Sequence, residues 1–200
     1  MTSQVEIANR ALDLLGAEAI VALTEDSENA RAINRSYNIV LRSMLRKHIW
    51  NCAKKRVVLA PLAAVPAFDY GYQFQFPSDC LRPIFPNDVT DWSVEKGGVL
   101  LTNDGNVLNL LYIAMLDDPN DMDDCFVEVF AGELAVKNCE KLTQSVSKRR
   151  EAKDELKTAW IDARKANAFE SIPNMQDYSS WVSARNVGPG ANPAQVQRRN

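Results

Sequence analysis

Apolar residues recur at helical spacing at the start of the chain. Val5, Ala8, Leu12 and Leu15 are three or four residues apart, which places them on one face of a helix. Gly16 follows, where a left-handed residue often ends a helix. The pattern predicts a helix that is capped by Thr2 or Ser3 and runs to about residue 15.

A longer helical pattern begins after an acidic segment, residues 25–28, of a kind that stabilises a helix amino terminus. The apolar positions that follow form one broad stripe: Ala30, Ile33, Tyr37, Val40, Leu41, Met44 and Leu45. This spacing predicts a helix that extends to the HIW segment at residues 48–50.

Four arginines lie on a different face of this second helix: Arg31, Arg35, Arg42 and Arg46. At about 100° per residue, that face is nearly opposite the apolar stripe. A solvated face is the ordinary explanation. Arginine is also enriched at interfaces, because its planar fork makes bidentate contacts. A contact with another subunit or partner is therefore a second interpretation, and DNA phosphates are a weaker third one.

The pattern changes to that of β-strands after Lys54. Tyr72, Phe74 and Phe76 alternate with glutamines, which is typical of a half-buried strand. The segment WSVEKGGVLLTNDGNVLNLLYIAML predicts three short strands joined by hairpin turns at residues 96–98 and 103–106. Residues 55–116 are therefore expected to form a small antiparallel β unit.

Helical spacing returns from about residue 121 to residue 142, and a fourth helix is predicted up to about residue 170. Beyond Ser171 the sequence has no period and few aliphatic residues, which predicts an extended arm. The fold class that follows is α+β: a four-helix bundle formed by residues 1–54 and 117–170, a β insert at 55–116 between helices 2 and 3, and an extended C-terminal arm at 171–200.

Composition narrows the functional classes. The 200 residues carry a formal net charge of −3, whereas nucleic-acid binders are usually basic. No apolar run is long enough to span a membrane, and the first residues lack the pattern of a secretory signal. Four cysteines lack metal-site spacing and are expected to be reduced, mostly buried thiols: Cys52, Cys80, Cys125 and Cys139.

The single histidine raises the question of a catalytic dyad. His48 and Cys52 are four residues apart, so on a continuing helix they would be neighbours. A Cys–His dyad also needs a group to orient the imidazole and an oxyanion site. No acidic residue or glycine-rich turn lies nearby in sequence, so a packed histidine and a buried cysteine are the favoured interpretation.

Five aspartates cluster in the segment DDPNDMDDCFVEV: Asp117, Asp118, Asp121, Asp123 and Asp124. Such clusters can hold calcium, but Pro119 and Met122 take positions where a ligand and a glycine belong. An acidic helix terminus is favoured instead. Phosphate-binding, zinc-protease and serine-hydrolase motifs do not occur. The sequence leaves open a carboxylate pair of the kind that glycosidases use, although nothing points to one.

Taken together, these segments resemble the head-to-tail adaptor family of short-tailed bacteriophages, also called tail tubular protein A. The resembling stretches are IANRALDLLG, NARAINRSYNIVLRSMLRKHIWNCAKKRVVLAP, FDYGYQFQFPSDCLRPI, VLLTNDGNVLNLLYIAMLDDPNDMDDCFVEVFAGELAVKNCEKLTQS and ARKANAFE. They cover roughly residues 4–170, and their order and spacing carry the likeness. The arm beyond Ser171 is not matched closely.

The resemblance implies a structural virion protein and not an enzyme, without catalytic residues, metal or cofactor. It implies a dodecameric ring of this chain, a connector between the portal protein above and the tail nozzle protein below, assembled in the host cytoplasm. DNA would pass through the lumen without specific binding, and no membrane would be involved. The alternative from a different class is a cell-wall or polysaccharide hydrolase associated with a phage tail.

The resemblance also assigns roles to particular residues. His48, Ile49, Trp50 and Ala53 would pack the junction between helices and β unit, and Lys54, Lys55 and Arg56 would form a solvated turn. The arm carries two aromatic residues and is locally basic, and such residues dominate interface energetics. Portal or subunit contacts are therefore expected at Trp181, Tyr178, Arg185, Arg198 and Arg199, in addition to the four arginines at positions 31, 35, 42 and 46.

Overall fold

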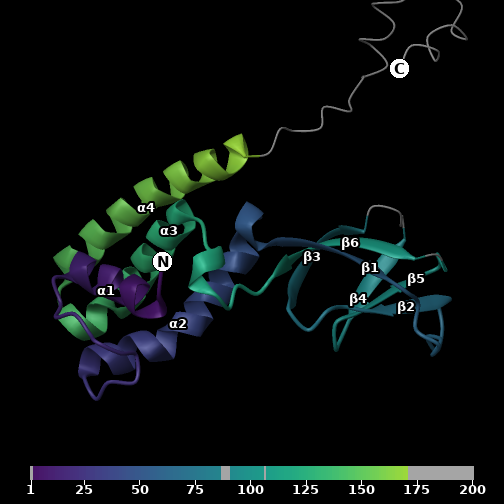
Figure 1. Cartoon of the computed structure of the whole chain (residues 1–200), viewed down its shortest axis with the longest axis horizontal. Coiled ribbons are helices and arrows are strands. Elements are labelled where there is room, and N and C mark those ends of the chain that lie inside the picture. Colours follow the sequence, from purple (N-terminus) through teal and green to yellow (C-terminus); the bar gives the residue numbers. More distant parts are fainter. Residues whose placement is uncertain (1, 87–90, 106, 171–200) are drawn as a thin grey trace, which may run out of the picture. The chain divides into compact units, whose positions relative to one another are not determined.

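The structure is a computed structural model that describes residues 2–86, 91–105 and 107–170. This part of the chain contains four α-helices, two 3-10 turns and six strands (Figure 1). In chain order they are α1 (Gln4–Leu15), α2 (Glu28–Lys47), η1 (Asn51–Ala53), β1 (Lys54–Leu59), β2 (Tyr72–Gln75), β3 (Cys80–Pro86), β4 (Trp92–Glu95), β5 (Val99–Thr102), β6 (Leu108–Ala114), η2 (Pro119–Asp121), α3 (Asp124–Thr143) and α4 (Val146–Phe169).

Each α-helix begins at a side-chain cap. Ser3 and Glu6 form a reciprocal capping box at α1, and Ser27 accepts a hydrogen bond from the amide of Ala30 at α2. Asp123 and Ser145 cap α3 and α4 in the same manner. These caps satisfy amide groups that have no partner inside a helix, so they fix where each helix starts.

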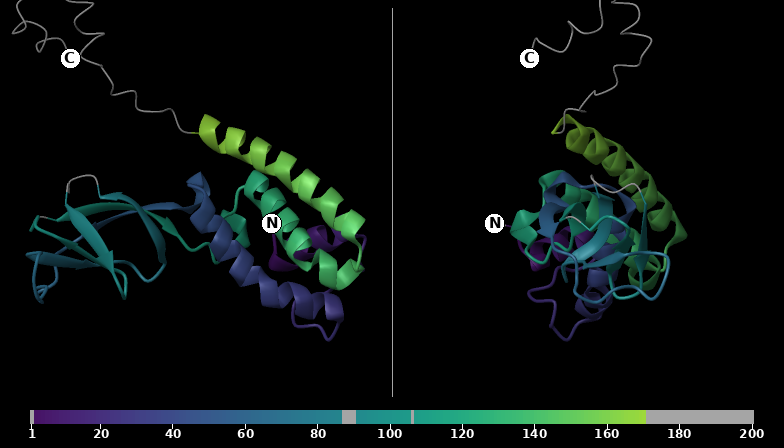
Figure 2. Two further views of the ribbon diagram at one scale, coloured as in Figure 1. Left: turned by 180° about the vertical axis from the view of Figure 1, so that it is seen from behind. Right: turned by 90° about the vertical axis from the view of Figure 1, so that its right-hand side faces the viewer.

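Helix α3 is the centre of the helical part. Ten of its residues are buried, and they lie around its whole circumference, as expected of a core helix. Helices α1, α2 and α4 all pack against it, and Figure 2 shows it between α2 and α4. Gly132 permits the close approach of α4, because a Cβ atom there would lie 3.0 Å from Leu156 Cδ1.

The six strands form two three-stranded antiparallel sheets. Sheet A has the order β1-β6-β3, and sheet B has the order β2-β5-β4. Side chains from both sheets form a core of their own, with Phe74, Phe76, Leu100, Leu108, Leu110, Tyr112 and Ala114 buried in it. Ile113, on the opposite face of β6, belongs to the helical core instead. Sheet A therefore carries one core on each of its faces.

The predicted four-helix bundle with a small β insert is wrong. The chain is α+β, but the six strands between α2 and α3 build two sheets with a separate core, so they are more than a minor insert. The helices also depart from the predicted bundle, because α1, α2 and α4 each pack on a central α3 that has buried residues on all of its sides. The three-part division at residues 54, 116 and 170 stays a prediction.

Two local predictions in the β part are also wrong. The turn after β5 was predicted to make a hairpin, yet β5 and β6 belong to different sheets, so the chain crosses between sheets there. The expected solvated turn Lys54–Arg56 is instead the start of β1, where Lys54 pairs with Ile113 and Lys55 with Tyr112. The hairpin between β4 and β5 is confirmed, with positive φ angles of 88° at Gly97 and 73° at Gly98.

Trp50 fills the junction between α2 and β1, as predicted. It is 2 % exposed, and its indole N–H donates to the carbonyl of Met44 at 3.2 Å. Its ring packs against Phe126 of α3, with centroids 4.9 Å apart, and against Trp160 of α4, at 5.4 Å. One side chain therefore connects three helices at the point where the chain enters sheet A.

Replacing Trp50 with alanine is expected to lower the free energy of unfolding by about 3–5 kcal/mol, the range for a large aromatic residue lost from a core. Urea unfolding followed by circular dichroism measures the loss. Phe68→Ala is the control, because Phe68 is 76 % exposed and its truncation is expected to change stability by less than about 0.5 kcal/mol. Equal midpoints for both variants would contradict the role of Trp50.

Candidate functional site

The arginine face of α2 is exposed, but its four members differ in what they contact. Arg31 pairs with Asp26, and the Nε of Arg35 donates to the carbonyl of Arg31 at 3.0 Å. Arg46 donates to the carbonyl of Leu81 at 2.6 Å. These three side chains are therefore partly engaged within the chain.

Two reciprocal hydrogen bonds join Arg46 to strand β3. While its guanidinium donates to the backbone of β3, Arg82 on β3 donates to the carbonyl of Arg46 at 3.0 Å. Arg42 has no such contact among the described residues, and it is exposed. Arg42 and the free end of Arg35 are thus the members of the face best placed to meet a partner.

A groove lies between α2 and α3, beside the arginine face. It consists of two adjoining openings of about 200 Å³ and 380 Å³, which share Ile39 and Lys137 in their walls. Its charged residues are Arg35, Lys47, Lys137, Lys141 and Glu133. We call this surface the basic groove. Four cations and one carboxylate give its lining a formal charge of +3.

Hydrogen bonds hold the helices together at the floor of the basic groove. Asn138 and Ser36, which are both buried, join α3 to α2 through a 2.8 Å hydrogen bond. Glu133 accepts a hydrogen bond from Lys47 at 3.0 Å and another from the indole of Trp160 at 3.2 Å. Ile39 projects above this floor and is 67 % exposed.

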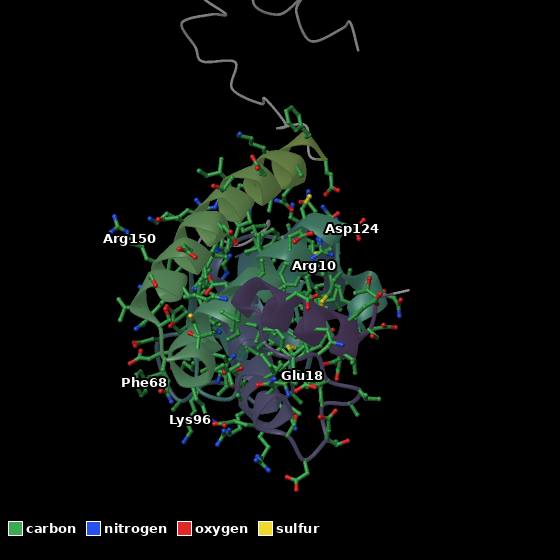
Figure 3. All side chains as sticks on the ribbon, turned by 90° about the vertical axis from the view of Figure 1, so that its left-hand side faces the viewer. Arg10, Glu18, Phe68, Lys96, Asp124 and Arg150 are labelled. Carbon is green, nitrogen blue, oxygen red and sulfur yellow. The ribbon has the colours of Figure 1, made fainter. Side chains whose placement is uncertain are left out.

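A second hollow, of about 780 Å³, lies between α1 and the start of α3. Its charged residues are Glu6, Asp13, Asp124, Glu128 and Arg10, two of which are labelled in Figure 3. We call it the acidic hollow, since four carboxylates and one guanidinium give a formal charge of −3. Arg10 donates to Glu128 at 3.0 Å. Asp13 and Asp124 have no ion-pair partner among the described side chains.

The junction around His48 is held by the end of α4. Asn167 accepts a hydrogen bond from the amide of Asn51 at 2.7 Å and donates to the carbonyl of Ile49 at 3.0 Å. In return, Asn51 donates to the carbonyl of Asn167 at 2.7 Å. Asn167 thereby satisfies two backbone groups in the segment that joins α2 to β1.

His48 packs at the junction and lies beyond the last turn of α2. It ends α2, so it does not share a helix with Cys52, and its ring meets Trp50 edge to face at 4.9 Å. Its ring nitrogen Nε2 lies 3.4 Å from the amide nitrogen of Asn167. Burial raises the pKa of the Cys52 thiol above its ordinary value, which disfavours a reactive thiolate.

The pKa of His48 is lowered from its ordinary value. Burial is the main cause, because it penalises the charged form, and the cations Arg164, Arg82 and Lys54 act in the same direction. These cations come from α4, β3 and β1 respectively. The imidazole is therefore held neutral at a point where three elements meet.

Two of the clustered aspartates cap the starts of helical segments. Asp118 caps η2, and Asp123 caps α3 by accepting from Cys125 at 2.9 Å. Within the described ranges, no three His, Cys, Asp or Glu side chains gather as a metal site. All four cysteines are free thiols, although only Cys139 is fully buried, and burial raises the pKa of Cys80 to about 11.

The five predicted contact residues of the arm lie outside the described residues: Tyr178, Trp181, Arg185, Arg198 and Arg199. Sequence reasoning missed Lys137, Lys141 and Asn167. The two lysines are four residues apart on α3, a signal that could have been read as one face of a helix. Nothing local marks Asn167, because its partners are more than a hundred residues away in the chain.

Comparison with known proteins finds no matching family model and no significantly similar curated protein. Among the described residues, no helix combines the length and apolar character needed to cross a membrane.

Asn167→Ala is expected to lower the free energy of unfolding by about 1–3 kcal/mol, since it leaves the amide of Asn51 and the carbonyl of Ile49 without partners. Asn34→Ala is the control, because Asn34 is exposed on α2 and its loss is expected to cost less than about 0.5 kcal/mol. Chemical denaturation of both variants measures the difference. Equal losses of unfolding free energy in the two variants would mean that the Asn167 contacts do not stabilise the fold.

Protonation of His48 is expected to destabilise the fold in mild acid. Because its folded pKa is lowered, the unfolded chain binds the proton more readily as pH falls below the ordinary value of about 6.5. The free energy of unfolding should therefore decrease between about pH 7.5 and about pH 5.5, and less steeply in His48→Gln. Denaturation of both proteins at each pH measures the two slopes. Equal slopes would mean that His48 titrates normally.

Proposed function

We propose that this chain is a head-to-tail adaptor of a short-tailed bacteriophage. It is a structural virion protein that forms a ring between the portal and the tail nozzle, and it catalyses no reaction. The ring encloses a lumen through which genomic DNA passes. Each copy contributes its surfaces to neighbouring copies and to the two partners above and below.

The observation that carries this proposal is the path of the chain from α2 into β1. In the adaptor family, the helix that ends in an aromatic residue continues directly into the first strand. Here α2 ends at Lys47, Trp50 is buried three residues later, and the short turn η1 (Asn51–Ala53) leads into β1 at Lys54. A buried aromatic residue between the helix and the first strand is what the resemblance implies, and this supports the proposal.

The physical role proposed for the ring is passive toward DNA. A protomer with a net charge of −3 repeated around an axis does not attract phosphates strongly. Strong attraction would slow DNA passage, because each neutralised phosphate adds affinity, above all at low salt. Mechanical continuity between portal and nozzle is then the main requirement, and a helical core packed around α3 suits that requirement.

The arm beyond Ser171 is proposed to reach the portal or a neighbouring subunit, with Trp181 as an anchor. A segment too poor in aliphatic residues to form a core can still wrap a partner's surface when it becomes ordered on binding. Its two aromatic residues and three arginines are of the kind that dominate interface energetics.

Removing the arm after Glu170 is the test. The truncated chain is expected to keep the circular dichroism and unfolding midpoint of the full chain, because residues 1–170 form a compact unit by themselves. Mixed with tail-less capsids, it is expected not to attach, whereas the full chain should appear by negative-stain microscopy as rings at the portal vertex. Full attachment of the truncated chain would refute the role of the arm.

Absence of rings for the full chain would refute the adaptor function itself. The hydrolase alternative is tested separately by zymography on peptidoglycan and polysaccharide. A cleared zone that disappears on substitution of the acidic-hollow carboxylates, for example Asp13→Asn with Asp124→Asn, would replace the adaptor proposal with the enzymatic one.

A further inference from the structure

Two surfaces of the helical part carry opposite charge of equal size. The basic groove has a formal charge of +3 and the acidic hollow has −3. Each also contains one internal ion pair, Lys47 with Glu133 and Arg10 with Glu128. With Lys141 also paired to Glu28 of α2 at 3.9 Å, and Glu6 held in the capping box of α1, the outward-facing charges are Arg35 and Lys137 on one surface and Asp13 and Asp124 on the other.

The two surfaces lie on opposite sides of α3. Glu128 in the acidic hollow and Lys137 in the basic groove are nine residues apart on this helix. At about 100° per residue, nine residues correspond to a rotation of about 180°. Helix α1 forms the other wall of the acidic hollow, and α2 forms the other wall of the basic groove. Because α3 lies between them, the two surfaces do not neutralise each other within one molecule.

We propose that the acidic hollow of one copy of this chain docks on the basic groove of the next copy. Asp13 and Asp124 then meet Arg35 and Lys137, with Ile39 inserted between them. This inference rests on the proposed function, for which it names the contact between neighbouring subunits. The proposed contact also includes Lys137 of α3, which is not part of the arginine face of α2.

A contact between two different surfaces is heterologous, so each copy can bind one neighbour on each side. Such contacts continue until they close as a ring, or extend as a filament if the rotation does not close. A self-complementary dimer would instead require the same patch on both copies. Opposite charges on opposite sides of one helix therefore fit the arrangement that a ring requires.

Charge complementarity selects a second copy as the occupant. A duplex nucleic acid would satisfy the cations of the basic groove but would leave the acidic hollow without a partner. A second copy satisfies both surfaces at once. Complementary surfaces also steer encounter, and like charges placed opposite each other suppress association.

The experiment reverses charge on each surface in the full-length chain. The groove variant carries Arg35→Glu and Lys137→Glu, and the hollow variant carries Asp13→Lys and Asp124→Lys. All four residues are exposed. None caps a helix, so both variants are expected to keep the circular dichroism of the parent. Sedimentation at low ionic strength, at chain concentrations up to roughly 1 mM, measures self-association over the range of weak contacts.

Two matched controls reverse the same number of charges on α4, away from both surfaces. Arg150→Glu with Lys153→Glu matches the groove variant, and Arg150 lies well apart from Arg10 and Asp124 in Figure 3. Glu151→Lys with Glu155→Lys matches the hollow variant. All four side chains are exposed. Both controls are expected to associate like the parent.

The parent chain is expected to self-associate, and each surface variant alone to associate at least about tenfold more weakly. An equimolar mixture of the two variants is expected to recover association, because each reversed surface then meets a reversed counterpart. Carbodiimide cross-linking of the parent, with one copy isotopically labelled, is expected to join Lys137 of one copy to Asp13 or Asp124 of another.

The proposal is overturned if the parent stays monomeric throughout, if either variant associates like the parent, or if the mixture does not recover. It is also overturned if the parent binds a short DNA duplex through the groove without self-association. These outcomes are separate from those for the proposed function. Copies that dock as described but do not attach to capsids would leave this contact standing and remove the adaptor role.

Discussion

A helix with buried residues on all of its sides is stable only when other elements pack against it along most of its length, and α3 is such a helix, with exposed charged residues such as Glu128 and Lys137 only where this cover ends. Three helices cover it, and their placement follows from that need. Where α1 and α2 meet α3, the long charged side chains at their margins remain in water. The two charged surfaces are thus a consequence of covering a central helix with three others. Their position on opposite sides of α3 has the same origin.

The helical and β parts are connected by a few buried contacts and not by a large mixed core. Trp50 joins α2 to α3 and α4 at the entry to β1, and Ile113 brings the outer face of sheet A into the helical core. Asn167 completes the junction from the far end of α4. The reciprocal hydrogen bonds between Arg46 and β3 add a polar contact between the two parts. A neutral His48 at the same place avoids adding a fourth cation to Arg164, Arg82 and Lys54.

The sequence predicts the helices well because their signals are local. Ser3, Ser27 and Ser145 are capping residues that stand next to the helices they start, and the apolar period follows at once. Strand pairing is decided by contacts between distant residues, so the Asn-Asp-Gly segment was predicted as a hairpin although β6 pairs with β1, some fifty residues earlier. For the same reason the arginine face was found, while the binding of Arg46 to β3 was not. The acidic hollow was missed because its residues come from both α1 and α3.

A net charge of −3 describes this chain poorly, because it averages over surfaces of opposite sign. Screening acts on exposed charges over about 10 Å at moderate salt, so a docking partner senses the local surface and not the total. A chain with separate +3 and −3 surfaces can attract its own copies while its average charge keeps it soluble. The remaining negative charge must then lie on surfaces that do not take part in this contact.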